Sequence, residues 1–565
     1  MARTVGIGIQ SFEKIIENNC FYVDKTDFIR EWWERGDDVT LITRPRRFGK
    51  TLTMSMLEEF FSVKYAGRSN LFEGLSIWQH EKYRALQGTY PVISLTFANV
   101  KETTYANTSY RICQIIADLY VKNRFLLEGD LLAEQEKEFY LSVRPDMSEV
   151  AAAIALHNLS DFLSRYYGKK VIILLDEYDT PMQEAYVNGF WDELVAFTRS
   201  MFNATFKTNP YLERAIMTGI TRVSKESIFS DLNNLEVVTT TSDKYATAFG
   251  FTEEEVFAAL DECGLGDERE RVKSWYDGFI FGDHKDIYNP WSIINFLDKH
   301  KYNTYWANTS SNSLVGKLIR EGSSDIKEKF ACLLKCEHLF EPIDEQIVYN
   351  QLSQNEAAIW SLLLASGYLK ALSHQGFLEA PIGEEPKYEL AVTNFEVLRM
   401  FHGMVKAWFA PVRPDYNGFV KALLSGDIDA MNVYMNRVAL ETFGYFDTGN
   451  RPSEYAEPER FYHGFVLGLL VDLQERYSVT SNRESGFGRY DVIIEPKSPA
   501  EDDAFILEFK VKNPRREATL EDTLQAALKQ IDDKAYDASL IEKGIPSERI
   551  HKYGFAFEGK TVLIG

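Results

Sequence analysis

A short polar loop between an apolar run and a helical pattern constrains the fold of this chain more than any other segment. The loop covers residues 44–51 and reads Arg-Pro-Arg-Arg-Phe-Gly-Lys-Thr. It follows the strand-like run Val39–Thr43 and leads into a helical pattern over Leu52–Phe61. A strand, a tight loop ending in Gly-Lys-Thr and a helix form the arrangement that cradles nucleotide phosphates. The segment therefore predicts a phosphate-binding loop.

The residues of this loop have separate expected roles. Gly49 would let the backbone approach the phosphates, Lys50 would reach the β- and γ-phosphates, and the Thr51 hydroxyl would bind Mg²⁺. Arg44 stands where the usual pattern has its first glycine, so the loop alone leaves nucleotide binding and a chance match equally open. The other loop residues expected to contact the nucleotide are Arg46, Arg47 and Phe48.

A continuous apolar run further along the chain ends in acidic residues. Residues 169–175 predict a strand buried on both faces, as in a parallel sheet. Asp176 at its end could hold Mg²⁺, and Glu177 could polarise the attacking water. The alternative is a core strand followed by a solvated acidic turn. The upstream Gly-Lys-Thr loop favours the nucleotide site.

Two further apolar segments, residues 90–95 and 214–220, predict strands of the same sheet. Ligands of such sheets bind at the carboxyl ends of the strands, so Thr218 could sense the γ-phosphate and Arg222 could stabilise phosphoryl charge. A strand-end threonine and a surface arginine are an equally good interpretation of these two residues. Helical patterns alternate with the strands and predict an α/β domain, as over residues 109–120 and 190–202.

Bulk properties limit the classes of protein to consider. At 565 residues the chain is long enough for about three domains, and its net charge of −22 argues against binding nucleic acid through bulk charge. Two local basic clusters stand out, at residues 44–50 and 510–516. No apolar run approaches the ~20 residues of a membrane span, and no signal peptide is visible. The five scattered cysteines predict buried thiols in a reducing cytoplasm.

The middle of the chain offers packing signals without a catalytic constellation. Thr252 and Glu255 form a capping box that predicts a helix start, and residues 275–281 form an aromatic strand-turn signal. A helix over 357–366 followed by a strand near 388–392 predicts a winged-helix-like arrangement. We expect a helical lid or coupling domain that packs against protein rather than nucleic acid, followed by a linker at residues 448–454.

A second group of charged residues lies near the C-terminus. Glu508 and Lys510 share one face of an apolar strand over 505–511, and Asp491 would start an adjacent strand of the hairpin. Two carboxylates and a lysine on one sheet face can bind Mg²⁺ and activate water against a phosphodiester. A cross-strand charge pair worth only ~0.2–1 kcal/mol is the alternative. Charges in so apolar a strand favour a bound ligand, and the following helix would carry Gln530 and Tyr536.

In combination these motifs resemble those of the bacterial AAA-ATPase-like proteins that carry a C-terminal nuclease domain of the PD-(D/E)XK superfamily. The resemblance implies a P-loop ATPase whose loop normally has the Arg-Pro-Arg-Arg-Phe-Gly-Lys form, with residues 22–25 near the adenine pocket. It also implies Mg²⁺-dependent nuclease-like chemistry at Asp491, Glu508 and Lys510, with Glu459 as an added metal ligand. The segments that carry it are residues 22–26, 44–51, 175–179, 218–222, 225–229, 288–291, 461–465, 484–491 and 508–510.

We therefore predict an α/β protein of three parts. Residues 1–245 would form a P-loop AAA-ATPase-like domain with a parallel sheet, 246–447 the helical or winged-helix-like domain, and 455–565 a restriction-endonuclease-like α/β domain. The expected function is ATP binding and hydrolysis that controls Mg²⁺-dependent nucleic-acid cleavage, with DNA favoured over RNA, in defence against mobile elements. The alternative is a nucleotide-regulated switch whose C-terminal domain binds nucleic acid or protein without cleavage. We expect a cytoplasmic protein without a membrane partner, and one that could form a homo-oligomer.

Overall fold

The chain divides into two compact units in its computed structural model, one formed by residues 1–315 and 338–397 and the other by 316–337 and 398–565. The limits of these units do not coincide with the domain boundaries predicted at residues 245 and 447, so the division into three domains stays a prediction. No helix in the described part of the chain is long and apolar enough to span a membrane. The structure describes residues 3–223, 229, 232–307, 315–316, 318–319, 322–344, 346–347, 358–375, 380, 385–408, 416–442, 466, 470, 473, 476–481, 484–485, 488–489, 492–499, 501–514, 516–559 and 561–565.

A five-stranded parallel sheet forms the centre of the first unit. Its strands are apolar runs, and every residue of β1 and β3 is buried, as expected of strands covered on both faces. The predicted α/β fold with a parallel sheet is thereby confirmed. In spatial order the strands are β2 (Val92–Thr96), β3 (Val171–Asp176), β4 (Leu212–Gly219), β1 (Val39–Thr43) and β6 (Leu235–Val238).

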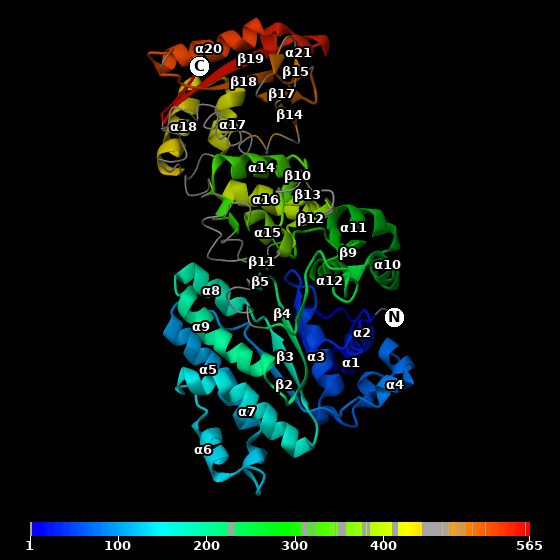
Figure 1. The fold of residues 1–565 in the computed structure, drawn as a ribbon. Coiled ribbons are helices and arrows are strands. Elements are labelled where there is room, and N and C mark those ends of the chain that lie inside the picture. Colours follow the sequence, from blue (N-terminus) through cyan, green and yellow to red (C-terminus); the bar gives the residue numbers. More distant parts are fainter. Residues whose placement is uncertain are drawn as a thin grey trace. The chain divides into compact units, whose positions relative to one another are not determined.

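Helices cover both faces of this sheet (Figure 1). Helix α3 starts at Lys50, so the last two residues of the loop are helical, and the helix begins two residues earlier than the apolar pattern predicts. On the same face as α3 (Lys50–Phe61) lie α1 (Phe12–Glu17) and α2 (Asp27–Arg35). The other face carries α5 (Tyr105–Lys122), α7 (Glu149–Tyr167), α8 (Thr180–Asn188) and α9 (Trp191–Phe202). The smaller α4 (Glu81–Arg84) lies on the side of α1 and α2, and α6 (Glu134–Ser142) lies beside α7.

The capping box predicted at Thr252 is confirmed, since it begins α10 with reciprocal hydrogen bonds to Glu255. The aromatic strand signal at 275–281 is wrong in its first two residues, which end α11. Val272 and Tyr276 are buried one helical turn apart, so packing of the helix overrides the β-propensity of the aromatic residues. The elements here are β7 (Phe251–Thr252), α10 (Glu253–Glu262), α11 (Arg269–Tyr276), β8 (Asp277–Phe281), β9 (His284–Tyr288) and α12 (Pro290–Lys299).

A small antiparallel sheet closes the first unit, with the strand order β10-β13-β12. The predicted helix near 357–366 and the strand near 388–392 are both present, and the winged-helix assignment itself stays a prediction. Helix α16 begins in this unit and continues into the second. The elements are β10 (Leu339–Pro342), α15 (Ala358–Ala365), β12 (Leu369–His374), β13 (Lys387–Val392) and α16 (Phe395–Trp408), and a two-residue pair joins β5 (Arg222–Val223) to β11 (Gln346–Ile347).

The second unit is built on a mixed five-stranded sheet with helices on both faces (Figure 1). Strands β18 and β19 run parallel, and α20 and α21 make the crossover between them. The strands are β14 (Tyr477–Ser481), β17 (Val492–Pro496), β18 (Ala504–Val511), β19 (Ile550–Glu558) and β20 (Thr561–Ile564). The helices are α14 (Ser324–Leu334), α17 (Tyr416–Ser425), α18 (Ile428–Thr442), α20 (Leu520–Asp533) and α21 (Ala538–Glu542).

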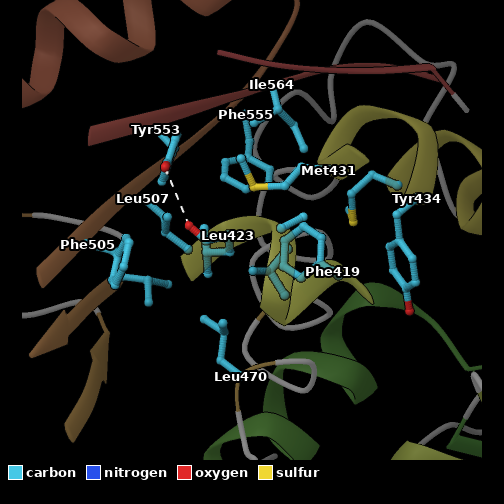
Figure 2. Close-up of a cluster of buried hydrophobic side chains, with 14 of the residues drawn as sticks. Phe419, Leu423, Met431, Tyr434, Leu470, Phe505, Leu507, Tyr553, Phe555 and Ile564 are labelled. Atoms are coloured by element: carbon cyan, nitrogen blue, oxygen red, sulfur yellow. Dashed lines mark hydrogen bonds between the residues drawn. The ribbon is translucent and has the colours of Figure 1, made fainter. Parts of the chain in front are cut away.

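Alternate residues of β18 pack on opposite faces of this sheet. Phe505 and Leu507 join the cluster formed with α17 and α18, which Figure 2 shows, whereas Ile506 packs toward α20 and α21. In the same view the Tyr553 hydroxyl points to the Leu423 carbonyl oxygen, 3.5 Å away. Residues 416–442, which the sequence assigns to the middle domain, therefore pack into the core on one face of the sheet of the second unit.

Two asparagines of α18 hold the edge strand β20. The Asn432 amide donates to the Ile564 carbonyl and accepts from its N–H, both at 2.8 Å. One turn later, the Asn436 amide donates to Val562 at 2.7 Å and accepts from it at 2.9 Å. The side-chain amides thus satisfy backbone groups that an edge strand would otherwise expose.

We predict that Asn432→Ala and Asn436→Ala each lower the free energy of unfolding of this unit by about 1–3 kcal/mol, since each leaves a peptide group of β20 without partners. Denaturant unfolding followed by a probe in this unit measures the effect. Val433→Ala is the matched control on the same helix, because Val433 is exposed. Asparagine variants as stable as the control would show that these hydrogen bonds do not stabilise β20.

Candidate functional site

A cavity of about 560 Å³ lies in the first unit at the carboxyl edge of the parallel sheet. Its wall includes the loop residues Arg46–Thr51 together with Asp176 and Glu177. Strands β1 and β3 both end at this edge, which is how two motifs more than 100 positions apart come to line one cavity. The fold thus brings together the loop and the acidic strand end that the sequence pairs.

The backbone of the loop is shaped for an anion. Gly49 adopts the left-handed conformation, with φ of 83°, directly before α3, and no side chain caps the helix. The first N–H groups of α3 are therefore available to an oxyanion, which the helix dipole also favours. Arg47 is left-handed as well, with φ of 65°, an uncommon conformation for a side chain of this size that is typical of functional loops.

Lys50 is buried and points back over its own loop. Its Nζ donates to the carbonyl oxygens of Arg44 at 2.9 Å and Pro45 at 3.0 Å. Burial lowers the pKa of Lys50, and the neighbouring carboxylates of Glu177 and Asp176 oppose that shift. A phosphate entering the cavity would give this ammonium group the charged partner that the carbonyls only partly replace.

Asp176 connects the loop to the neighbouring strand. The Thr51 hydroxyl donates to one carboxylate oxygen at 2.7 Å, and the Thr218 hydroxyl donates to the other through a short bond. Burial raises the pKa of Asp176, while these two hydrogen bonds favour the carboxylate form. A hydroxyl beside a carboxylate is the oxygen donor set that Mg²⁺ prefers, so these residues fit that ion.

Glu177 follows in a conformation that few residues adopt. Its φ is 55°, and its side chain accepts a hydrogen bond from the Thr180 hydroxyl at 3.0 Å. Its backbone N–H lies 3.4 Å from the Thr218 hydroxyl oxygen. A left-handed glutamate costs about 1–3 kcal/mol and persists where the surroundings hold it, often at a reactive centre.

Arg44 and Phe48 anchor the loop through their side chains. Arg44 is fully buried and donates to the carbonyls of Thr239, by a short bond, and of Thr43, at 3.1 Å. The Phe48 ring packs edge-on against Phe279, with 4.8 Å between ring centroids. An arginine at the usual first glycine is thus explained by the carbonyls that receive its guanidinium.

Thr218 and Arg222 differ from the other expected residues. Among the residues that the structure describes, neither lines the cavity. Thr218 is buried and reaches the site through Asp176, whereas Arg222 belongs to the short strand β5 and pairs with Gln346 of β11. Their assignment to the nucleotide stays a prediction.

Three residues that the sequence does not single out for the site contact the loop from a later part of the chain, namely Asn289, Trp291 and Trp306. The carbonyl oxygen of Arg46 accepts from Trp306 Nε1 at 2.9 Å and from Asn289 Nδ2 at 3.3 Å. The guanidinium of Arg47 lies over the Trp291 ring, 4.3 Å from its centroid. The segment at 288–291 belongs to the motifs of the resemblance, but no local pattern predicts these contacts.

Glu396 in turn holds Trp306. Its buried carboxylate accepts from the Trp306 N–H at 2.6 Å, the Ala307 N–H at 3.3 Å and the Ser292 hydroxyl at 2.7 Å. Burial raises the pKa of Glu396 to about 7, and these hydrogen bonds oppose the shift. Glu396 of α16 is therefore connected through Trp306 to the Arg46 carbonyl oxygen of the phosphate loop.

We predict that Glu396→Ala destabilises the first unit by about 3 kcal/mol or more and weakens ATP binding, because it removes the buried carboxylate that accepts hydrogen bonds from Trp306, Ala307 and Ser292. Thermal unfolding and a nucleotide titration measure the two effects. Glu138→Ala is the control, since Glu138 is an exposed residue of α6. Unchanged stability and affinity would show that Glu396 does not support the loop.

A second polar group lies in the other unit, on the face of β18 that packs against α20. Glu508 is only 2% exposed, and one of its carboxylate oxygens accepts a short hydrogen bond from Gln530. The Gln530 carbonyl oxygen accepts from Lys510 Nζ at 2.7 Å, and its amide donates to the Tyr536 hydroxyl at 3.1 Å. Glu508 and Lys510 thus share one face, as predicted, with Gln530 between them.

Other residues expected at this centre cannot be placed. Asp491, Glu459 and the linker predicted at 448–454 lie outside the described residues. Gln530 is on α20, as predicted, whereas Tyr536 follows the helix, which ends at Asp533. The expectation that both lie on this helix is wrong, because the chain turns at Ala535, with φ of 49°.

Two parts of the chain match known families. Residues 6–229 match the family described as predicted AAA-ATPase, and residues 457–565 match the PD-(D/E)XK nuclease superfamily. The chain carries an AAA-ATPase-like and a PD-(D/E)XK nuclease-like domain. Both matches confirm the resemblance drawn from the motifs. The chain is also 24% identical to the "Uncharacterized protein in vnfD 5'region" of Azotobacter chroococcum mcd 1, over 98% of this chain and 96% of that protein.

Proposed function

We propose that the first unit binds Mg²⁺-ATP in the cavity and hydrolyses it, and that its nucleotide state controls a metal-dependent nuclease-like centre in the second unit. The observation that carries the proposal is the convergence of Lys50, Thr51, Asp176 and Glu177 on one cavity. The match to an AAA-ATPase family supports the choice of ATP.

Different side chains would bind the phosphates, hold the metal ion and accept a proton during hydrolysis. Lys50 and the first N–H groups of α3 would hold the β- and γ-phosphates. Thr51 and Asp176 would hold Mg²⁺, which when bound would neutralise phosphate charge. Glu177 would accept the proton of the attacking water. Thr218 would keep Asp176 oriented through the short bond between them.

The centre of the second unit would act on a phosphodiester. The carboxylate of Glu508, nearly buried yet on the same face as Lys510, fits the role of one ligand of a hard cation. Asp491 and Glu459 would complete the ligand set, and the metal when bound would lower the pKa of a water molecule. Lys510 would stabilise the charge of the phosphate under attack.

A regulatory switch without cleavage is the second candidate. The net charge of −22 favours it, because a strongly acidic chain as a whole does not attract a polyanion such as nucleic acid. In that case the C-terminal domain would bind nucleic acid or a protein partner, and the polar group around Gln530 would be a satisfied internal network.

A cleavage assay distinguishes the two candidates. Wild-type protein and Lys50→Ala are incubated with single- and double-stranded DNA and RNA, in Mg²⁺ or Mn²⁺, with and without ATP. We expect divalent-dependent cleavage, strongest on DNA, that changes with ATP in the wild type only. ATP hydrolysis without cleavage of any substrate under any condition would favour the switch.

A further inference from the structure

Two arginines of the phosphate loop line the cavity, and their guanidinium groups contact residues of two different helices. The Arg46 guanidinium donates to the Gln183 side-chain carbonyl on α8, at 3.3 Å. The Arg47 guanidinium lies over the ring of Trp291, which belongs to α12. Neighbouring residues of one loop therefore present their charges toward two different parts of the cavity.

The residue that holds Arg46 lies just outside the cavity lining, next to the acidic strand end formed by Asp176 and Glu177. Gln183 lies one turn into α8, the helix that follows Glu177, and its amide nitrogen is 3.5 Å from the Asp179 carboxylate. Lys50 is close enough to Arg46 to be affected by its charge. Burial is the main cause of the lowered pKa of Lys50, and the charge of Arg46 lowers that pKa further. Arg46 thus lies among the groups expected around the γ-phosphate.

The wall that holds Arg47 is largely apolar. Trp291 lines the cavity together with Pro290, Ile294 and Phe251. None of these side chains can polarise water or hold a metal ion. This wall suits the parts of a nucleotide away from the reacting phosphate.

We propose that Arg46 stabilises the charge that develops on the γ-phosphoryl group from within the same chain, whereas Arg47 binds the nucleotide without acting on the chemical step. In that step the water oxygen bonds to the γ-phosphorus, and Glu177 takes the water's proton. The bond from phosphorus to the bridging oxygen breaks, and its electron pair stays on ADP. Arg46 would exchange its 3.3 Å contact with the neutral amide of Gln183 for anionic phosphoryl oxygens, because a guanidinium binds a phosphate more strongly, and often through two hydrogen bonds.

The position of Arg46 has a consequence for assembly. Phosphoryl-transfer enzymes take such an arginine either from the same chain or from a partner. Arg46 is four residues from Lys50, so each chain carries its own, and no second copy is needed to complete the site. Arg222, the arginine that the sequence suggests for this role, does not line the cavity among the described residues.

Because this inference rests on the proposed ATP hydrolysis, the experiment measures ATP binding, kcat and KM in the wild type and in single variants. Arg46→Ala should lower kcat on the order of 10³-fold and leave ATP binding nearly unchanged. Arg46→Lys should give an intermediate kcat, since it keeps the charge without the planar fork. Arg47→Ala should raise KM with little change in kcat. Arg271→Ala, which alters an exposed arginine of α11, is the control.

A mixing experiment tests whether the arginine acts within one chain. Arg46→Ala protein is combined with Lys50→Ala protein, whose chains keep Arg46 but lack the phosphate-binding lysine. We expect no recovered activity, and a wild-type kcat that does not change on dilution. Recovery in the mixture, or a wild-type kcat in Arg46→Ala, would overturn the inference and leave the proposed function standing.

Two further outcomes are informative. The Arg46 carbonyl, not its side chain, holds Trp306 and Asn289, so Arg46→Ala should fold, and thermal unfolding checks this. If it does not fold, Arg46→Lys decides: a wild-type kcat would overturn the inference, and a lowered kcat would support it. Wild-type protein that neither binds nor hydrolyses ATP would overturn the proposed function together with the inference.

Discussion

Glu177→Gln should bind ATP as the wild type does and hydrolyse it about 10²- to 10⁴-fold more slowly, the range expected when a general base is lost. The amide keeps the shape of the side chain and its contact with Thr180, but it cannot accept the proton of the attacking water. Single-turnover hydrolysis and an ATP titration on the same preparation separate chemistry from binding.

Glu184→Gln is the matched control for this variant. Glu184 lies on α8, a few residues beyond Glu177, and does not line the cavity among the described residues. We expect it to hydrolyse ATP at the wild-type rate. Equal rates in both variants and the wild type would remove Glu177 from the reaction.

Lys510→Ala and Glu508→Gln should each lower divalent-dependent cleavage of nucleic acid by about 10²-fold or more, without changing ATP hydrolysis. The first removes a charge that would stabilise the phosphate under attack. The second removes an anionic ligand from a site that needs several to hold a hard cation. Cleavage time courses in Mg²⁺ measure both.

A lysine of the same unit supplies the control for these variants. Lys543 pairs with Glu495 at 2.7 Å in an exposed position, so Lys543→Ala breaks an ion pair without touching the group around Gln530. If Lys510 and Glu508 form only a structural network, their variants should lose stability and retain whatever activity the wild type has.

The sequence predicts those parts of the site whose residues lie within a strand or directly at its carboxyl end. Apolar runs place β1 and β3 in a parallel sheet, and the carboxyl ends of such strands meet at one edge. The meeting of Thr51 with Asp176 follows from these two facts. The shared face of Glu508 and Lys510 follows from the period of two in a strand.

The support of the loop could not be predicted in this way. Arg46 is hydrogen-bonded to Asn289 and Trp306, which lie 243 and 260 positions away. No local periodicity or capping signal reports a contact over that distance, because it depends on how whole elements pack. The same holds for Asn432 and Asn436, whose partners in β20 lie more than 100 positions away.

The loop itself shows why a motif can depart from its usual form. The Arg44 side chain is fully buried, and its guanidinium donates hydrogen bonds to the carbonyl oxygens of Thr43 and Thr239. The residue that weakens the match to a phosphate loop in sequence is therefore what fixes the loop in the fold. Only the structure distinguishes this from a loop with an exposed arginine.

Calorimetric titration of ATP measures whether the cavity at the edge of the parallel sheet is the Mg²⁺-ATP site that we propose. Wild type, Lys50→Ala and Asp176→Asn are titrated with and without Mg²⁺. We predict that Lys50→Ala binds ATP roughly 10- to 100-fold more weakly, the loss expected for one charged contact, and that Asp176→Asn loses most of the Mg²⁺ dependence. Variants that match the wild type in affinity and in Mg²⁺ dependence would show that ATP does not bind in this cavity.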